Sequence, residues 1–272
     1  MRHPRLVLAF CVLFVLPLPA PAATNCPRII SQSPYITHTL EWLGLKDCIV
    51  GVSRYDRLDR PRTGGVLDPD AEAIAALAPD LMLTSDWIED KVWQAVAPKG
   101  ASAIRLHGFQ RMAQIEDNLR VVATAAGQTD GEARAQGFAR AWRAKAGQVH
   151  AGGTRALLLS ACGGTPYSFG RRTWLYDLFT TAGFHMVETA EKIRHIKPGQ
   201  EVEHLGRLIE ELKPQVVFIF ERTLSTECAV IPPKTGVRIV NLDGEQFLHP
   251  APVLLEGLDT LIARRAQWRK TP

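Results

Sequence analysis

At 272 residues, the chain is long enough for one large domain or for two lobes of about 110 residues each. Its 46% hydrophobic and 22% charged residues are typical of a soluble globular protein. The net charge is +4, and it falls to +2 if Arg2 and Arg5 are removed with a cleaved N-terminal signal. So small a net charge gives no reason to expect a surface that binds nucleic acid or a membrane.

Residues 1–22 predict a cleaved export signal. Two arginines precede an apolar run from Leu6 to Leu16, and Ala20 and Ala22 then stand in the small-residue register that signal cleavage requires. The apolar run is shorter than the roughly 20 residues that span a membrane. We therefore expect a soluble, exported protein that is cleaved near Ala22.

Strand and helix signals alternate along the rest of the chain. Such alternation predicts the α/β class, with parallel sheets that carry helices on their faces. The predicted strands are residues 28–33, 49–53, 81–85, 102–107, 155–161, 216–221 and 237–242.

Four cysteines follow the signal, and in an oxidising compartment an even number favours disulfides. Cys26 and Cys48 precede the first two predicted strands. If these strands are parallel neighbours, their starting ends are adjacent and a Cys26–Cys48 bridge becomes geometrically reasonable. Loop entropy gives such a bridge about 3 kcal/mol. Cys162 and Cys228 could pair across the second half, and the sequence leaves that pairing open.

Two segments of the chain share the same pattern of apolar residues and proline. "IAALAPDLMLTS" begins at Ile74 and "IEELKPQVVFIF" begins at Ile209. In each, a helix ends before a proline, Pro79 or Pro214, which cannot continue it, and an apolar strand follows. Each segment also has a strand upstream, so the pattern predicts two similar Rossmann-like lobes.

The segment "TDGEARAQGFARAWRAKAGQVHAGGT" predicts a long helix between these lobes. It places Phe138 and Trp142 on one helical face, and about 20 helical residues span roughly 30 Å, the diameter of a small lobe. We expect lobes at residues 23–128 and 153–272, joined by one helix at residues 129–152. A packed helix within a single domain is the alternative.

Six segments of the mature chain share their order and spacing with one protein family: "RIISQSPYIT", "LGLKDCIVGVSRYD", "GGVLDPDAEAIAALAPDLMLTS", "QIEDNLRVVATAAGQTD", "GRRTWLYDLFTTAGF" and "HPAPVLLEGLDTLIA". Through them the chain resembles the periplasmic substrate-binding proteins of ABC importers for vitamin B12, ferric siderophores and haem. The resemblance implies two α/β lobes bridged by one long backbone helix, and an inner-membrane permease/ATPase complex as partner. The chain departs from the family at His38, where a glutamate is frequent, and at Arg207, where the second lobe usually has one.

Ligands of open parallel sheets bind beyond the carboxyl ends of the strands. The residues there combine aromatic rings with arginines, which suits a large, partly planar and partly anionic ligand such as a corrinoid or a ferric siderophore. For each aromatic the alternative is a packed ring at the rim, and for each arginine a solvated side chain. The candidate ligand-binding residues are Tyr35, Arg54, Tyr55, Trp87, Tyr167, Phe169, Arg171 and Arg222.

Two glutamates are candidates for docking to the importer. In "DPDAEAI", Asp68 can cap a helix and Pro69 fits its first position, so the helix dipole alone favours an acidic Glu72. The resemblance implies that Glu72 pairs with arginines of the membrane importer. Glu203 is the nearest counterpart in the second lobe.

An enzyme reading has little support. Cys162, with His107 or His195, could be written as a cysteine hydrolase, but no third residue orients the pair. The chain also lacks the H-E-x-x-H and G-x-S-x-G motifs. We expect no catalysis, no cofactor beyond the bound chelate, no nucleic-acid partner, and a monomer.

Two other receptor classes remain as alternatives. A haem receptor would use Tyr35 or Tyr55 as an iron ligand, because the stretch "TGGVLDP", where the family's haem binders often carry a tyrosine, has none. A receptor for a bare metal ion would use several of the histidines His38, His107, His185, His195, His204 and His249.

Overall fold

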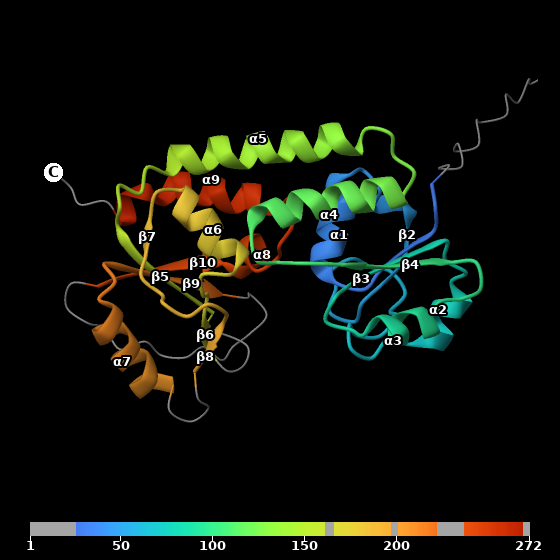
Figure 1. Cartoon of the computed structure of the whole chain (residues 1–272), viewed down its shortest axis with the longest axis horizontal. Helices are drawn as coiled ribbons and strands as arrows, with labels where there is room; N and C mark the ends of the chain where they lie inside the picture. The colour runs from blue at the N-terminus through green and yellow to red at the C-terminus, as the bar shows by residue number, and fades with distance from the viewer. Residues whose placement is uncertain (1–25, 161–165, 197–200, 222–236, 269–272) are drawn as a thin grey trace, which may run out of the picture.

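The computed structural model describes residues 26–160, 166–196, 201–221 and 237–268. Two β-sheets lie side by side, and a long helix crosses both on one side of the molecule (Figure 1). The elements from β1 to α4 form an N-terminal lobe, and those from β5 onward form a C-terminal lobe. Within the described residues, no helix has the length and apolar character needed to cross a membrane.

The N-terminal sheet is fully parallel, with strand order β2-β1-β3-β4. Its strands coincide with those predicted, because each is a short apolar run ended by polar residues. They are β1 (Ile29–Ser31), β2 (Ile49–Val52), β3 (Leu81–Ser85) and β4 (Ser102–Leu106).

The C-terminal sheet has strand order β10-β9-β5-β6-β8, with β7 beside β5. The long strands β5, β9 and β10 are parallel and match the prediction, whereas β6 pairs antiparallel with both of its neighbours, β5 and β8. Three strands of two residues each were too short to carry a sequence pattern. The strands are β5 (Arg155–Ser160), β6 (Tyr167–Ser168), β7 (His185–Met186), β8 (Arg194–His195), β9 (Val216–Glu221) and β10 (Arg238–Asp243).

Helices cover both sheets and follow the strands as expected for α/β units. They are α1 (Pro34–Trp42), α2 (Ala71–Ala76), α3 (Asp90–Ala95), α4 (Met112–Ala125), α5 (Gly131–Val149), α6 (Trp174–Thr181), α7 (Glu201–Leu212), α8 (Gly244–Phe247) and α9 (Leu254–Arg264), with short 3-10 turns at Lys46–Cys48 and Arg265–Gln267.

One hydrophobic core runs through both lobes on the α5 side of the sheets. Alternate residues of each strand point to opposite faces: in β5, Leu158 joins this shared core, while Leu157 joins a smaller cluster under α7. In β1, Ile29 joins the shared core and Ile30 the cluster near α2 and α3. One face of each sheet therefore packs in the common core, and the other face packs in a separate, smaller cluster of its own lobe.

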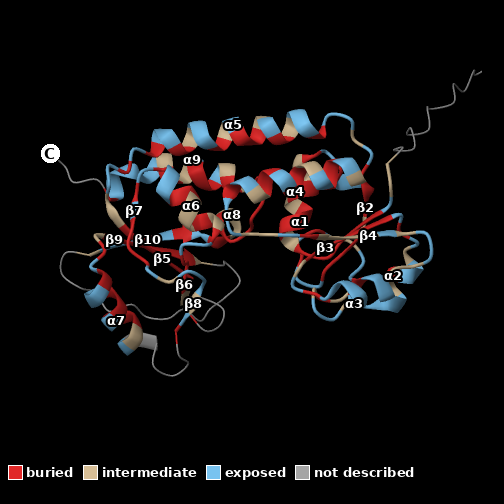
Figure 2. Cartoon of the chain, in the orientation of Figure 1, coloured by how far each residue is buried: buried red, intermediate tan, exposed pale blue. Residues whose placement is uncertain are grey.

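Helix α5 packs against α4, α6 and α9, and so against both lobes. Its Phe138 and Trp142 are buried, as their spacing predicted, and the Trp142 indole donates a hydrogen bond to Glu116 of α4 at 2.8 Å. Lys145 pairs with Asp259 of α9. Figure 2 shows α5 exposed on its outer face and buried on the face toward the lobes.

The repeated sequence pattern corresponds to a repeated structural device. The residues before the two prolines, Ala78 and Lys213, have φ values of +42° and +47°. In the N-terminal lobe the Arg28 guanidinium donates to the carbonyls of Leu77 and Ala78, at 2.8–3.2 Å. In the C-terminal lobe Arg155 donates to the carbonyls of Leu212 and Lys213 at 2.6 and 3.0 Å. Each arginine thus satisfies the carbonyl groups that end the helix before the next strand.

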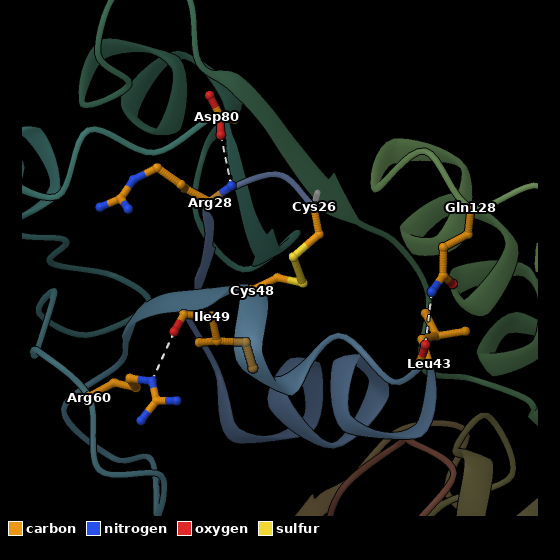
Figure 3. The surroundings of a disulfide bond; sticks show 8 residues. All are labelled: Cys26, Arg28, Leu43, Cys48, Ile49, Arg60, Asp80 and Gln128. Atoms are coloured by element: carbon orange, nitrogen blue, oxygen red, sulfur yellow. Dashed lines mark hydrogen bonds between the residues drawn. A yellow bond between two sulfur atoms is a disulfide. The ribbon is translucent and has the colours of Figure 1, made fainter. Parts of the chain in front are cut away.

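A disulfide joins Cys26 to Cys48, with the Cα atoms 5.9 Å apart (Figure 3). The two cysteines precede β1 and β2, which pair in parallel with Ile29 opposite Ile49. The predicted bridge is therefore confirmed. The second possible pair, Cys162 with Cys228, lies outside the described residues.

Candidate functional site

The carboxyl ends of the N-terminal strands bring four predicted segments into one row. Strand order places Tyr55, Tyr35, Trp87 and His107 beyond β2, β1, β3 and β4 respectively. Tyr55 is 70% exposed and Trp87 is 67% exposed. Two large aromatic rings thus face solvent at one edge of the sheet, where burial by a ligand would stabilise a complex.

Tyr35 lies behind this edge. It is only 4% exposed, and its ring packs edge-on against Phe109 with centroids 4.9 Å apart. Ser85 is close to its hydroxyl without forming a hydrogen bond of normal geometry. Burial, and then the negative charge of Asp86, raise the pKa of Tyr35 well above its ordinary value. In this conformation Tyr35 supports the edge and stays protonated.

Two of the predicted arginines face carboxylates. Arg54 pairs with Asp68, and its guanidinium carbon lies 5.9 Å from the centre of the Tyr55 ring. Arg171 lies 3.7 Å from Glu191. Both pairs are partly exposed, so they are weak in water and an anionic ligand can compete for either guanidinium.

In the C-terminal lobe, Tyr167 marks the carboxyl end of β5, because it pairs with Ser160 in the sheet. Its half-buried ring lies 5.8 Å from that of His195. Phe169 is 1% exposed and packs against Trp174 and Phe220. Here the ring of Phe169 is part of the core, as the packed alternative held, and only Tyr167 reaches the surface.

The strand ends of the two lobes meet directly. The backbone amide of Trp174 donates to the carbonyl of Phe109 at 3.2 Å, and Arg172 donates to Gln110 at 2.7 Å. The segment after β4 therefore touches the segment after β6. The aromatic residues beyond the N-terminal strands and the carboxyl end of β5 therefore both lie at the contact between the two lobes.

The predicted docking residues lie on exposed helices. Glu72 is exposed in the first turn of α2. The cap of that helix is Asp70, which accepts from the Ala73 amide at 3.0 Å, and not Asp68 as the sequence indicated. Asp68 is instead held by Arg54. Glu203 of α7 is 67% exposed and pairs with the Arg207 guanidinium at 2.9 Å.

Several predicted residues lie outside the described part of the chain. They are Arg222, the thiol Cys162 of the hydrolase alternative, and Cys228. The export signal of residues 1–22 lies outside it as well.

A cluster of ligating groups joins the lobes at a place that the strand-end analysis missed. His38 of α1, Glu245 of α8 and His249 have ligand atoms that all lie within 4.8 Å of one another. Burial, and then the neighbouring His249 and Arg57, lower the pKa of His38 to about 4, so its imidazole is neutral at neutral pH. The sequence names His38 and His249 only among the six histidines of the bare-metal alternative, and it marks Glu245 only by its four-residue spacing from His249.

The sequence profile of the family described as periplasmic binding protein matches residues 29–228 of this chain. The chain belongs to that family. Members of this family bind solutes without catalysing a reaction, which confirms the expectation that the protein is not an enzyme. No curated protein matches the sequence.

Solved structures of similar fold support the two-lobe arrangement of this periplasmic binding protein. A periplasmic haem-binding protein of Pseudomonas aeruginosa has a TM-score of 0.70 at 21% identity, over 90% of this chain and 94% of its own. A periplasmic vitamin B12 binding protein of Vibrio cholerae has a TM-score of 0.63 at 17% identity, over 90% and 99%. A possible iron-binding protein of Staphylococcus epidermidis has a TM-score of 0.64 at 18% identity, over 88% and 98%. At these identities the likeness establishes the fold: two α/β lobes with parallel sheets.

Proposed function

We propose that this periplasmic binding protein captures a metal chelate, a corrinoid or a ferric siderophore, and presents it to an inner-membrane ABC importer. The observation that carries the proposal is the exposure of Tyr55 and Trp87 at the carboxyl edge of the N-terminal sheet. Vitamin B12 and iron are the ligands that two structures of the same fold are named for.

Aromatic burial supplies the expected affinity. Covering about 100 Å² of ring surface contributes about 2.5 kcal/mol, so Tyr55 and Trp87 together could supply a substantial part of a micromolar affinity. Arg54 and Arg171, now paired with carboxylates at partly exposed positions, would turn toward an acidic ligand. Tyr167 would contribute the opposite wall from the C-terminal lobe.

Haem is a second candidate ligand, favoured by the geometry around Tyr55. The exposed phenol stands beside the Arg54 guanidinium, and a tyrosine oxygen is an established axial ligand of haem iron. The haem-binding protein of Pseudomonas aeruginosa shares the fold. Tyr55→Phe keeps the ring and removes the ligand atom, so it should weaken haem binding while leaving cobalamin binding intact.

The importer is proposed to dock on the side of the molecule opposite α5. Helices α2 and α7, which carry Glu72 and Glu203, lie on that side in the two lobes (Figure 1). Exposed glutamates on both would offer two anchoring charges to arginines of the permease. The proposal also includes cleavage near Ala22, a monomeric protein, and lobes at residues 23–128 and 153–272 joined by the helix at residues 129–152.

A fluorescence titration of the mature, untagged protein tests the proposed function. Cobalamin, haem and a panel of ferric siderophores should each be added, because Trp87 is exposed and should be quenched by a bound chelate, with Trp174 as a second reporter. Tyr55→Ala should weaken binding, whereas Val121→Ala, exposed on α4, should not. If no chelate binds below about 10 μM, roughly −7 kcal/mol, the proposal is wrong.

A further inference from the structure

The two lobes meet at a compact group of metal-ligating side chains. His249 Nε2 and Glu245 Oε2 lie 3.0 Å apart, four residues from one another in the chain. The rings of His249 and His38 have centroids 5.1 Å apart. His38 comes from α1 of the N-terminal lobe, so the group spans the junction between lobes.

We propose that His38, Glu245 and His249 bind a divalent transition-metal ion, with zinc as the best fit, and that this ion ties the two lobes together. Two imidazoles and one carboxylate form a donor set that suits zinc and its neighbours, whereas magnesium and calcium prefer oxygen ligands alone. Ligands at tetrahedral angles around zinc lie about 3.3 Å apart. The pair from the C-terminal lobe already has nearly this separation.

His38 supplies the second, independent observation. Its side chain is 11% exposed, and its Nε2 atom is buried without a hydrogen-bond partner among the described residues. A buried ring nitrogen without a partner costs about 1–3 kcal/mol. The His249 side chain is 9% exposed, so both imidazoles stand largely out of water. A metal ion would satisfy the Nε2 atom that the protein leaves unpaired.

An outer layer is in place to orient His38. Glu41 Oε2 lies 3.9 Å from His38 Nδ1, and Arg57 lies between them, 3.3 Å from Nδ1 and paired with Glu41. An arginine only donates, so in the metal-free protein Nδ1 accepts and the ring proton sits on Nε2. When Nε2 binds a metal, the ring proton moves to Nδ1, so the Arg57 guanidinium must turn away from Nδ1 and Glu41 becomes the acceptor. A carboxylate behind a histidine is the common support of such ligands.

A cavity of about 510 Å³ adjoins the cluster and gives the ion a route of entry. Its lining includes the carboxylates of Glu41, Asp243, Glu245 and Glu256 beside the guanidinium of Arg57. The excess of negative charge attracts cations. With three protein ligands, the fourth position is left for water from this cavity.

The site must tighten when it is filled. The three ligand atoms lie within 4.8 Å, against the 3.3 Å or so of a zinc site, so His38 must approach the other two by up to about 1.5 Å. Because the ligands come from different lobes, binding would hold α1 against the segment after α8. The ion is therefore a structural tie, separate from the exposed rings of Tyr55 and Trp87.

The test is metal binding to the mature, untagged protein with no chelate present. Zinc affinity is measured by competition with a chromophoric chelator, and cobalt reports the coordination by its visible absorption. One ion per chain with a Kd below about 1 μM is expected, and zinc at 100 times its Kd should raise the Tm by about 5 °C. No binding below 100 μM would overturn the proposal.

Variants locate the ion. His38→Gln and His249→Gln should each weaken zinc binding by about 100-fold or more, and Glu41→Gln by about 10-fold. His185→Gln, an exposed histidine on β7, is the matched control and should bind zinc normally. If His249→Gln fails to fold, His38→Gln alone decides the outcome. An unchanged zinc affinity in His38→Gln would refute the site. Whether this variant still binds a chelate bears only on the proposed function, so the two proposals fail separately.

Discussion

Glu188 is an acidic side chain held inside the C-terminal lobe. It is 1% exposed and accepts from the amides of Thr189 and Ala190 at 2.8 and 2.9 Å, from Arg194 at 2.7 Å, and from Ser168. Burial alone would raise its pKa, but the hydrogen bonds from Arg194, Ser168 and the backbone outweigh burial and lower the pKa. These bonds fix the segment that leads into β8.

This network predicts a loss of stability in acid. Because the folded pKa is depressed, Glu188 contributes stability that is fully present above its ordinary pKa of 4.5 and is lost as the pH falls through the folded pKa. Glu188→Gln should lower the unfolding free energy at pH 7 by about 1–3 kcal/mol. Urea unfolding at pH 7 and pH 3 measures both effects.

The control for Glu188 is Glu211→Gln, an exposed carboxylate on α7. This variant should unfold like the parent protein at both pH values. The explanation fails if Glu188→Gln loses as much stability between pH 7 and pH 3 as the parent does.

At the scale of elements, one arginine in each lobe binds the end of a helix in the same way. The guanidinium groups of Arg28 and Arg155 each donate hydrogen bonds to carbonyl groups at the C-terminal end of the helix that precedes a strand. Replacing Arg28 or Arg155 by Met keeps most of the apolar stem but removes the donors. Each variant should lose about 1 kcal/mol of unfolding free energy, and the double variant about 2, because the sites lie in different lobes. Arg140→Met, exposed on α5, is the control, and denaturant midpoints at equal slope give the values.

The sequence predicted the long strands and the long helix because their patterns are local. Apolar runs such as Val216–Glu221 carry a complete signal, and Phe138 with Trp142 set the buried face of α5. Strands β6, β7 and β8 have two residues each and exist only because a neighbouring strand pairs with them. Local rules also placed the cap of α2 at Asp68, whereas the helix begins at Ala71 with Asp70 as its cap and Asp68 pairs with Arg54.

The candidate site was predictable only in part, because a local sequence pattern does not show which distant residues pack together. Parallel strands all end at the same edge of a sheet, so Tyr55 and Trp87 could be named from sequence. The burial of Tyr35 and Phe169 depends on what packs over them, which no local pattern contains. The proposed metal-binding cluster joins residues from two lobes. The sequence named His38 and His249 only among six scattered histidines, and nothing local showed that these two meet Glu245.

At the scale of the whole molecule, α5 and the shared core limit how far the lobes can move. Helix α5 packs against elements of both lobes, and it contains no proline at which it could bend. Free and chelate-bound crystals should therefore differ by a small hinge rotation. A rotation of tens of degrees between the two would show that α5 is not the restraint.

The proposed docking to an importer also depends on the surface of the whole molecule. Glu72→Arg should leave chelate affinity unchanged while abolishing uptake into cells, because it reverses an exposed charge on α2 that is not among the proposed ligand-binding residues. Glu203→Arg should behave in the same way if α7 is the second anchor. Asp117→Arg, exposed on α4, should transport normally. Normal uptake by Glu72→Arg would remove this residue from docking.

The shared core also decides how the protein can be divided. One apolar cluster includes Leu119 and Val122 of α4, Phe138 and Trp142 of α5, and Leu258 of α9. A fragment that ended after α4 would expose to water the surface that α5 now covers, and a fragment that began at β5 would lose the same cover. We therefore expect neither lobe to be soluble when produced alone, and a domain swap between relatives should carry α5 together with α4, α6 and α9, the helices that it packs against.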